Sequence, residues 1–255
     1  MKQKKDLFIR YRNNKQTMTF ILGAHCSDGI VMVGDRKMSR SNGSPTYEAK
    51  IFQDIQNVVL GASGVVGLYD KFRQQIFDTV QENPNMNQMS FIGASEKIVF
   101  ELNRTYIERT RGGTIELLVA NGKTTIGNLQ FVTANGVGEV VRRYQVIGSG
   151  EPYGEFFLKR LWKPEMTMEQ VAVLGVAIIR IIEDNELDTG VGTKDNPQVW
   201  YIPDWGNVNY DELTIEQQKK FQTRELQDEE LNNIVRKSNE LSKSINTLFG
   251  GIKII

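Results

Sequence analysis

The sequence has little of the chemistry that defines several protein classes. It contains one cysteine, Cys26, and one histidine, His25, among 255 residues. A single cysteine excludes an internal disulfide framework and fits a reducing cytoplasm, which is where we expect the protein. Neighbouring residues on a strand point to opposite faces, so this His-Cys pair is a poor metal site. Because the chain also has no phosphate-binding loop, dinucleotide fingerprint or Cys/His cluster, we expect neither a metal nor an organic cofactor.

Charge and hydropathy argue against two kinds of partner. The chain carries 31 basic and 31 acidic residues, a formal net charge of 0, which gives no electrostatic footprint for nucleic acid or an anionic membrane. The longest strongly apolar run, residues 171–179, is too short to span a bilayer. With 40% hydrophobic and 24% charged residues, the composition is typical of a globular protein with a buried core.

What the sequence does contain is a strong hairpin signal, TFILGAHCSDGIVMVGDR, at residues 19–36. Two apolar runs rich in Val, Ile, Phe and Thr flank a turn at Asp28-Gly29. Such a hairpin would place the Thr19 hydroxyl and the Asp35 carboxylate near the same end of neighbouring strands. We therefore consider Thr19 a candidate nucleophile.

The remaining elements occur in groups of strands and helix pairs. A loop rich in Ser, Asn, Gly and Pro is expected at residues 39–45, and Ser90 and Thr167 are expected to cap helices. Further strands are expected at residues 47–53, 57–62, 114–120, 126–133, 139–147 and 198–202. Helices are expected at about residues 65–82, 91–106, 153–161 and 168–184. Two helix pairs around antiparallel sheets predict an α+β fold, a four-layer α/β/β/α sandwich.

The composition changes after residue 204, where the chain becomes charged and helix-forming. An amphipathic stripe recurs at three- and four-residue steps and comprises Leu231, Ile234, Leu241, Ile245 and Leu248. This stripe could pack on the core of its own domain or on another subunit. We therefore divide the chain into an N-terminal extension or propeptide at 1–18, a main domain at 19–204 and a helical C-terminal extension at 205–255.

Several moderately specific motifs follow one another between residues 17 and 204. They are TFILGAHCSDGIVMVGDR, YEAKIF, ASG, YQVIGSGEPYGEFFLKRLW, and MTMEQVAVLGVAIIRIIED followed by DTG. Their order and spacing resemble the β-type proteasome subunits of the N-terminal-nucleophile hydrolase superfamily. The resemblance implies the same four-layer sandwich and assembly into homo- or hetero-oligomeric stacked rings, with α-type subunits as candidate partners. It also implies self-processing at Met18–Thr19 and hydrolysis of peptides or unfolded proteins by the exposed threonine.

The resemblance implies a set of catalytic positions in this sequence. They are Thr19, Asp35, Lys50, Gly64, Ser149, Glu186 and Thr189. Thr19 would be the nucleophile, and its own freed α-amine, which titrates near ~8, would accept the hydroxyl proton. Lys50 would favour the neutral amine, and Asp35 would keep Lys50 charged. The Gly64 N–H would stabilise the tetrahedral oxyanion.

The other implied positions are less direct. Ser149 would lie beside the threonine amine, while Glu186 and Thr189 fall on a late Asp-x-x-Ser-Gly element of the family. Either Asp184 or Asp188 could substitute for Glu186 if the loop shifts. The first specificity pocket would be lined by Met38, Glu48, Ala62 and Val66. That mixed lining selects no side-chain type.

Two alternatives to a peptidase stay open at this point. Met18 stands where active members of the family have glycine, which permits the tight turn that self-cleavage needs. This residue, together with Glu186 and the extra helix, favours a catalytically inactive structural ring subunit. The same acyl-enzyme chemistry could also pass the acyl group to an amine, as in a peptide ligase, although no residue selects this transferase.

Overall fold

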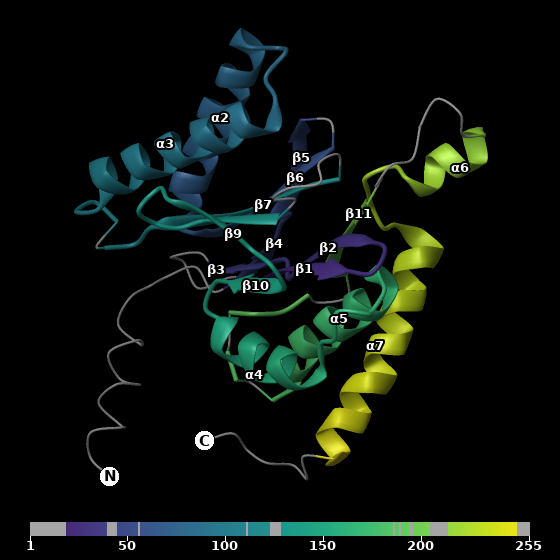
Figure 1. Ribbon diagram of the computed structural model, residues 1–255. Coiled ribbons are helices and arrows are strands. Elements are labelled where there is room, and N and C mark those ends of the chain that lie inside the picture. The colour runs from purple at the N-terminus through teal and green to yellow at the C-terminus, as the bar shows by residue number, and fades with distance from the viewer. Residues whose placement is uncertain are drawn as a thin grey trace, which may run out of the picture.

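The computed structural model contains two antiparallel sheets of five strands each, with helices on their outer faces (Figure 1). The mixture of helices and strands confirms the predicted α+β class. The structure describes residues 19–39, 45–55, 57–110, 112–122, 129–185, 187–188, 190–193, 196–204 and 214–248. The predicted extension at 1–18 and two of the predicted site residues, Glu186 and Thr189, lie outside this described part.

The first sheet is built around the predicted hairpin. Its strands β1 (Ile21–Cys26) and β2 (Gly29–Gly34) pair antiparallel, with Ile21 opposite Gly34 and Cys26 opposite Gly29. In spatial order the sheet contains β10 (Tyr144–Ile147), β1 (Ile21–Cys26), β2 (Gly29–Gly34), β11 (Gln198–Pro203) and β12 (Arg224–Glu225). The hairpin therefore lies at the centre of the sheet rather than at an edge.

The second sheet contains the strands that follow the hairpin in sequence. In spatial order they are β5 (Ile51–Ile55), β6 (Val58–Gly64), β7 (Ile115–Asn121), β8 (Leu129–Val132) and β9 (Gly138–Val140). A separate two-stranded ribbon of β3 (Lys37–Ser39) and β4 (Pro45–Tyr47) joins the two sheets along the chain. Apolar side chains such as Ile21, Met32, Leu118 and Leu129 form one buried cluster with members from both sheets.

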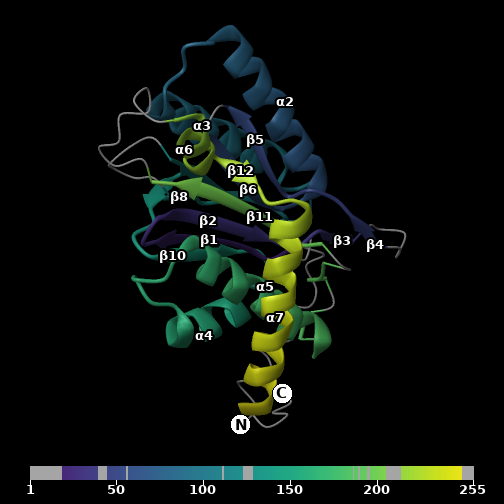
Figure 2. The same ribbon diagram turned by 90° about the vertical axis from the view of Figure 1, so that its right-hand side faces the viewer.

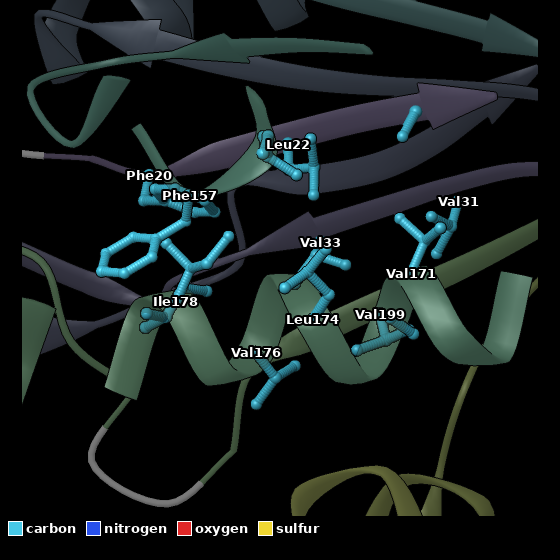
Figure 3. Packing of buried hydrophobic residues seen from close by; sticks show 14 of the residues in the cluster. Phe20, Leu22, Val31, Val33, Phe157, Val171, Leu174, Val176, Ile178 and Val199 are labelled. Carbon is cyan, nitrogen blue, oxygen red and sulfur yellow. The ribbon is translucent and has the colours of Figure 1, made fainter. Parts of the chain in front are cut away.

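Two helix pairs bury the other faces of the sheets. The first pair, α2 (Val66–Glu82) and α3 (Gln88–Tyr106), packs on the second sheet, and the second pair, α4 (Glu151–Leu161) and α5 (Met168–Asp184), packs on the first. Leu22 and Val33 from the hairpin meet Leu174 of α5 in this core (Figure 3). A side chain at Gly175 would lie 3.1 Å from Leu22, so glycine permits the close approach of α5 to the hairpin.

The C-terminal segment folds against the same domain. It contains α6 (Ile215–Lys220), the edge strand β12 and α7 (Asp228–Leu248), which runs along α5 (Figure 2). From the predicted stripe, Leu231, Ile234 and Ile245 are buried in the core beneath the first sheet, whereas Leu248 is 82% exposed. The sequence left two partners open for this stripe, the core of its own domain and another subunit. In the structure the stripe packs on the core of its own domain.

Two predicted strands are wrong because the chain changes sheet within them. The expected strand at 139–147 is divided into β9 and β10, which belong to different sheets. Between them, Val141 N donates to Leu129 O in the second sheet and His25 N donates to Arg143 O in the first. The expected strand at 47–53 is likewise divided between β4 and β5. Hydrophobic pattern alone does not mark such a crossing, because both halves are strand-like.

Other element boundaries in the structure also differ from those predicted. Asn87, not Ser90, caps α3, since its side chain accepts from Ser90 N at 2.9 Å. The expected loop at 39–45 ends inside the β3–β4 ribbon, with residues 40–44 outside the described part. Strand β11 is followed by another strand, β12.

The capping box at Thr167 is present as predicted. In the described ranges, no helix is long and apolar enough to cross a membrane.

Candidate active site

The site begins where the hairpin strands end. Thr19 and Phe20 come directly before β1, and Asp35 comes directly after β2. Asp35 N donates to Phe20 O at 3.0 Å, and Phe20 N donates to Asp35 Oδ1 at 2.8 Å. The first hydrogen bond extends the pairing of the hairpin by one residue, and the second holds the Asp35 carboxylate against the backbone next to Thr19. The proximity of Thr19 and Asp35 that the hairpin predicts is thus present in the structure.

Lys50 forms a buried ion pair with Asp35. Lys50 Nζ donates to Asp35 Oδ1 at 2.8 Å and to Lys37 O at 2.5 Å, and the two charged side chains are only 6% and 0% exposed. Gly192 N donates to the second carboxylate oxygen at 3.3 Å. Burial raises the pKa of Asp35 and lowers the pKa of Lys50, and in each case the charge of the partner opposes the shift. Losing either partner would leave a buried charge without compensation.

The Gly148-Ser149-Gly150 turn holds the other side of Thr19. Thr19 N donates to Ser149 Oγ at 3.2 Å, and Gly150 N donates to Thr19 O at 3.1 Å. Gly148 has a φ of +99°, and a side chain there would approach Thr19 O to 2.2 Å. The turn therefore needs glycine at 148 for both its backbone conformation and its contact with the threonine.

Gly64 ends β6 on the wall of a small pocket. Its φ is +123°, and a Cβ atom would lie 1.9 Å from Thr114 O, so no other residue fits without moving the neighbouring strand. The pocket has a volume of about 30 Å³. It is lined by Thr19, Met38, Ala49, Lys50, Ala62, Ser63, Gly64, Val66 and Tyr69. Three of the four residues expected to line a specificity pocket are in this set, and Glu48 is not.

Five of the predicted site residues therefore come together around Thr19. They are Thr19 itself, Asp35, Lys50, Gly64 and Ser149. Glu186 and Thr189 lie outside the described residues, so their place in the site stays a prediction. Asp188, which the sequence offers as a substitute for Glu186, accepts from Gly190 N at 3.0 Å. The negative charge of Asp188 also raises the pKa of Lys50. Burial has a larger effect on this pKa and lowers it.

Sequence reasoning missed Gln198, which is 1% exposed and joins the two sheets at the site. Its Oε1 accepts from the backbone N–H groups of Lys50, at 2.5 Å, and Ile51, at 3.0 Å. Its Nε2 donates to Ile51 O at 2.8 Å. A glutamine at the start of the strand expected at 198–202 gives no signal by itself, because only its burial in the structure shows that its polar atoms require partners. Which residues supply those partners follows only from the packing of the sheets.

The described residues around Thr19 include no set of metal ligands. In the part of the chain that the structure describes, no three His, Cys, Asp or Glu side chains are close enough to hold a metal ion. His25 and Cys26 lie at the far end of β1 from Thr19, where His25 Nε2 is 2.9 Å from Val141 O. Burial raises the pKa of the Cys26 thiol, which keeps it protonated. Near Thr19 the described residues supply a hydroxyl, a buried ion pair and backbone N–H groups.

Comparison with known proteins agrees with the predicted family. A family model described as proteasome subunit matches residues 16–195. Among solved structures, an Anbu (Gly-1) mutant from Hyphomicrobium sp. strain MC1 aligns over 92% of this chain and 97% of its own, with 15% identity and a TM-score of 0.66. Anbu, an ancestral beta-subunit, from Yersinia bercovieri aligns over 90% and 96%, with 13% identity and a TM-score of 0.67. Because the family model spans more than half of the sequence, the chain belongs to the proteasome subunit family.

Proposed function

We propose that the protein is a threonine-type endopeptidase whose nucleophile is Thr19, exposed by cleavage of the Met18–Thr19 bond. The observation that supports this most is the convergence of Phe20 N and Lys50 Nζ on one buried oxygen of Asp35, directly beside Thr19. A structural subunit would gain little from burying a lysine, because a buried ion pair seldom adds stability over an apolar pair. An ion pair retained at this cost beside a hydroxyl is better explained by catalysis.

The first reaction is self-processing. The Thr19 hydroxyl attacks the Met18 carbonyl carbon, and the Met18–Thr19 amide becomes an ester on Thr19 Oγ while the Thr19 nitrogen takes up a proton. Water then hydrolyses the ester and releases the segment that precedes Thr19. The free α-amine left behind has an ordinary pKa of about 7.7–8.0, so part of it is neutral and can act as a base near neutral pH.

Peptide hydrolysis then uses the same atoms. The neutral amine takes the hydroxyl proton, directly or through a water, and Oγ attacks the substrate carbonyl. The Gly64 N–H stabilises the resulting oxyanion, a contact worth about 3 kcal/mol. The tetrahedral intermediate expels the amine half of the substrate, whose nitrogen takes the proton from the α-ammonium. Water then hydrolyses the acyl ester and restores the threonine.

The charged residues act on the proton transfers. The Lys50 ammonium lowers the pKa of the nearby amine and favours the developing alkoxide, and the Asp35 carboxylate keeps Lys50 protonated despite its burial. Ser149 Oγ, at 3.2 Å from the Thr19 nitrogen, would orient the amine. Glu186 and Thr189 complete the proposed set.

The proposal extends to architecture and assembly. We infer a four-layer α/β/β/α sandwich at residues 19–204, a removable segment at 1–18 and a helical extension at 205–255. We also infer assembly into rings, with α-type subunits as candidate partners, and hydrolysis of peptides or unfolded proteins in the cytoplasm. The family match over residues 16–195 supports the fold and the ring assembly, and the single cysteine supports the cytoplasmic location.

The test compares three purified proteins: wild type, Thr19→Ala and Thr19→Ser. We expect the wild type to hydrolyse fluorogenic peptides. The activity should fall to background in Thr19→Ala and be retained in part in Thr19→Ser, which keeps a hydroxyl. A peptide epoxyketone, which reacts with a hydroxyl and an adjacent free amine, should label only chains that begin at Thr19. Equal activity in Thr19→Ala would exclude this mechanism.

A further inference from the structure

The C-terminal extension reaches the active site through the two-residue strand β12. Glu225 on this strand lies opposite Trp200 of β11 and is 24% exposed at its side chain. Its Oε1 accepts from Arg36 Nη2 at 3.0 Å and from Gln198 Nε2 at 3.4 Å. One carboxylate oxygen of the extension therefore contacts two side chains at the first sheet. Arg36 follows the end of β2 by two residues, and Gln198 is the first residue of β11.

The contact with Gln198 leads to Lys50. The Gln198 amide donates from Nε2 to Ile51 O and to Glu225, so its Oε1 is left facing the backbone N–H groups of Lys50 and Ile51. This amide has only one favourable orientation, because a flip would turn its NH₂ group toward the backbone N–H groups of Lys50 and Ile51. Gln198 thus fixes the backbone of Lys50, and Glu225 helps to fix Gln198.

The contact with Arg36 leads to Asp35, the residue before it. Arg36 Nε donates to Asn196 O at 2.9 Å, while its backbone N–H donates to Gly192 O at 3.2 Å. Gly192 in turn donates to Asp35 Oδ2. Glu225 holds the end of the Arg36 side chain, next to Asp35, and through Gln198 it is linked to the backbone of Lys50.

We propose that Glu225 is a positioning residue, by which the C-terminal extension holds Lys50 and Asp35 in register for catalysis. The inference rests on the proposed function, since it assigns the network a role in that reaction. The two halves of the ion pair come from different sheets, and a small shift of one sheet over the other would separate Lys50 Nζ from Asp35. Charge-assisted hydrogen bonds are the stronger and more directional kind, which suits this role.

Glu230 provides a matched control. It is a carboxylate of the same extension, pairs with Arg224 at 2.8 Å, and is 56% exposed at its side chain. Neither member of this pair contacts Gln198, Arg36 or Lys50 through a described hydrogen bond. Glu225→Ala and Glu230→Ala therefore remove the same charge from the same segment, and only the first removes the link to the site. Glu225→Gln keeps an acceptor oxygen for both partners.

Two measurements on the full-length protein test the inference. The first is hydrogen exchange by mass spectrometry at the amides of Lys50 and Ile51, which bond to Gln198. Exchange should become about fivefold faster in Glu225→Ala, stay unchanged in Glu230→Ala and change little in Glu225→Gln. The second is peptide hydrolysis, where kcat should fall about tenfold in Glu225→Ala with KM unchanged, because only transition-state geometry is affected.

The outcomes separate this inference from the proposed function. Unchanged exchange and unchanged kcat in Glu225→Ala, with an active wild type, would overturn the inference alone. Equal effects in Glu225→Ala and Glu230→Ala would also overturn it, because they would indicate general destabilisation. A wild type that hydrolyses no peptide would refute the proposed function, while faster exchange at Lys50 in Glu225→Ala would still support the network.

Discussion

Replacing Lys50 by methionine should destabilise the fold through the charge that it leaves behind. The variant removes the cation and keeps most of the apolar volume. Among the described residues, the buried Asp35 carboxylate then keeps two backbone N–H partners, Phe20 and Gly192. Removing one member of a buried pair costs about 3–5 kcal/mol. For a chain of this size that corresponds to a fall in Tm of about 6–20 °C.

The loss of stability in Lys50→Met should depend on pH through the Asp35 carboxyl group. Burial raises the pKa of Asp35, and the variant removes the Lys50 charge that counteracts this shift. Between the unfolded-state pKa and the raised folded-state pKa, the folded variant then binds more protons than the unfolded chain, so stability falls as pH rises through that range. The deficit of Lys50→Met relative to wild type should therefore shrink as pH falls from 7 toward 5.

Urea unfolding at fixed protein concentration measures both effects. Asp35→Asn in the Lys50→Met background removes the stranded charge, and the double variant should be more stable than the sum of the two single losses predicts, by about 2–3 kcal/mol. A loss below about 1 kcal/mol in Lys50→Met, or a loss that does not change with pH, would refute the buried pair as described.

Three further substitutions test separate parts of the structure. Gly64→Ala should lower both stability and peptidase activity, because its Cβ would meet Thr114 O at 1.9 Å; Gly67→Ala, with nothing within 4 Å, is its control in a thermal melt and should be neutral or slightly stabilising. Ser149→Ala should reduce kcat with little change in Tm, since it removes one partner of the Thr19 nitrogen; an unchanged kcat would exclude the assigned role. Thr167→Ala should cost about 1 kcal/mol, or about 2–4 °C in Tm, by removing the capping box of α5, with activity per folded molecule retained.

The sequence was most informative where a pattern is local. The hairpin at 19–36 predicted the contact between Thr19 and Asp35 because strand pairing across a short turn determines the register. The capping box at Thr167 was readable for the same reason, since all its partners lie within three residues. Lys50, Gly64 and Ser149 were located through the resemblance to a family, because nothing local marks them as neighbours of Thr19.

Contacts between distant segments could not be read from the sequence. The division of residues 139–147 between two sheets depends on which strands lie opposite each half, and each half is strand-like by itself. Gln198 and Glu225 are ordinary polar residues in sequence, and their importance follows from the packing of β11 against β12 and of one sheet over the other. The partner of the stripe on α7 was open for the same reason.

The N-terminus of the mature chain is the most direct test of the central claim. Intact-mass measurement and N-terminal sequencing of the assembled wild-type protein, with Thr19→Ala beside it, determine whether Thr19 becomes the first residue. We predict a wild-type chain that begins at Thr19 and a Thr19→Ala chain that keeps Met18. A wild-type protein that is fully assembled and still carries Met18 would contradict it, since Thr19 would then have no free amine to act as its base.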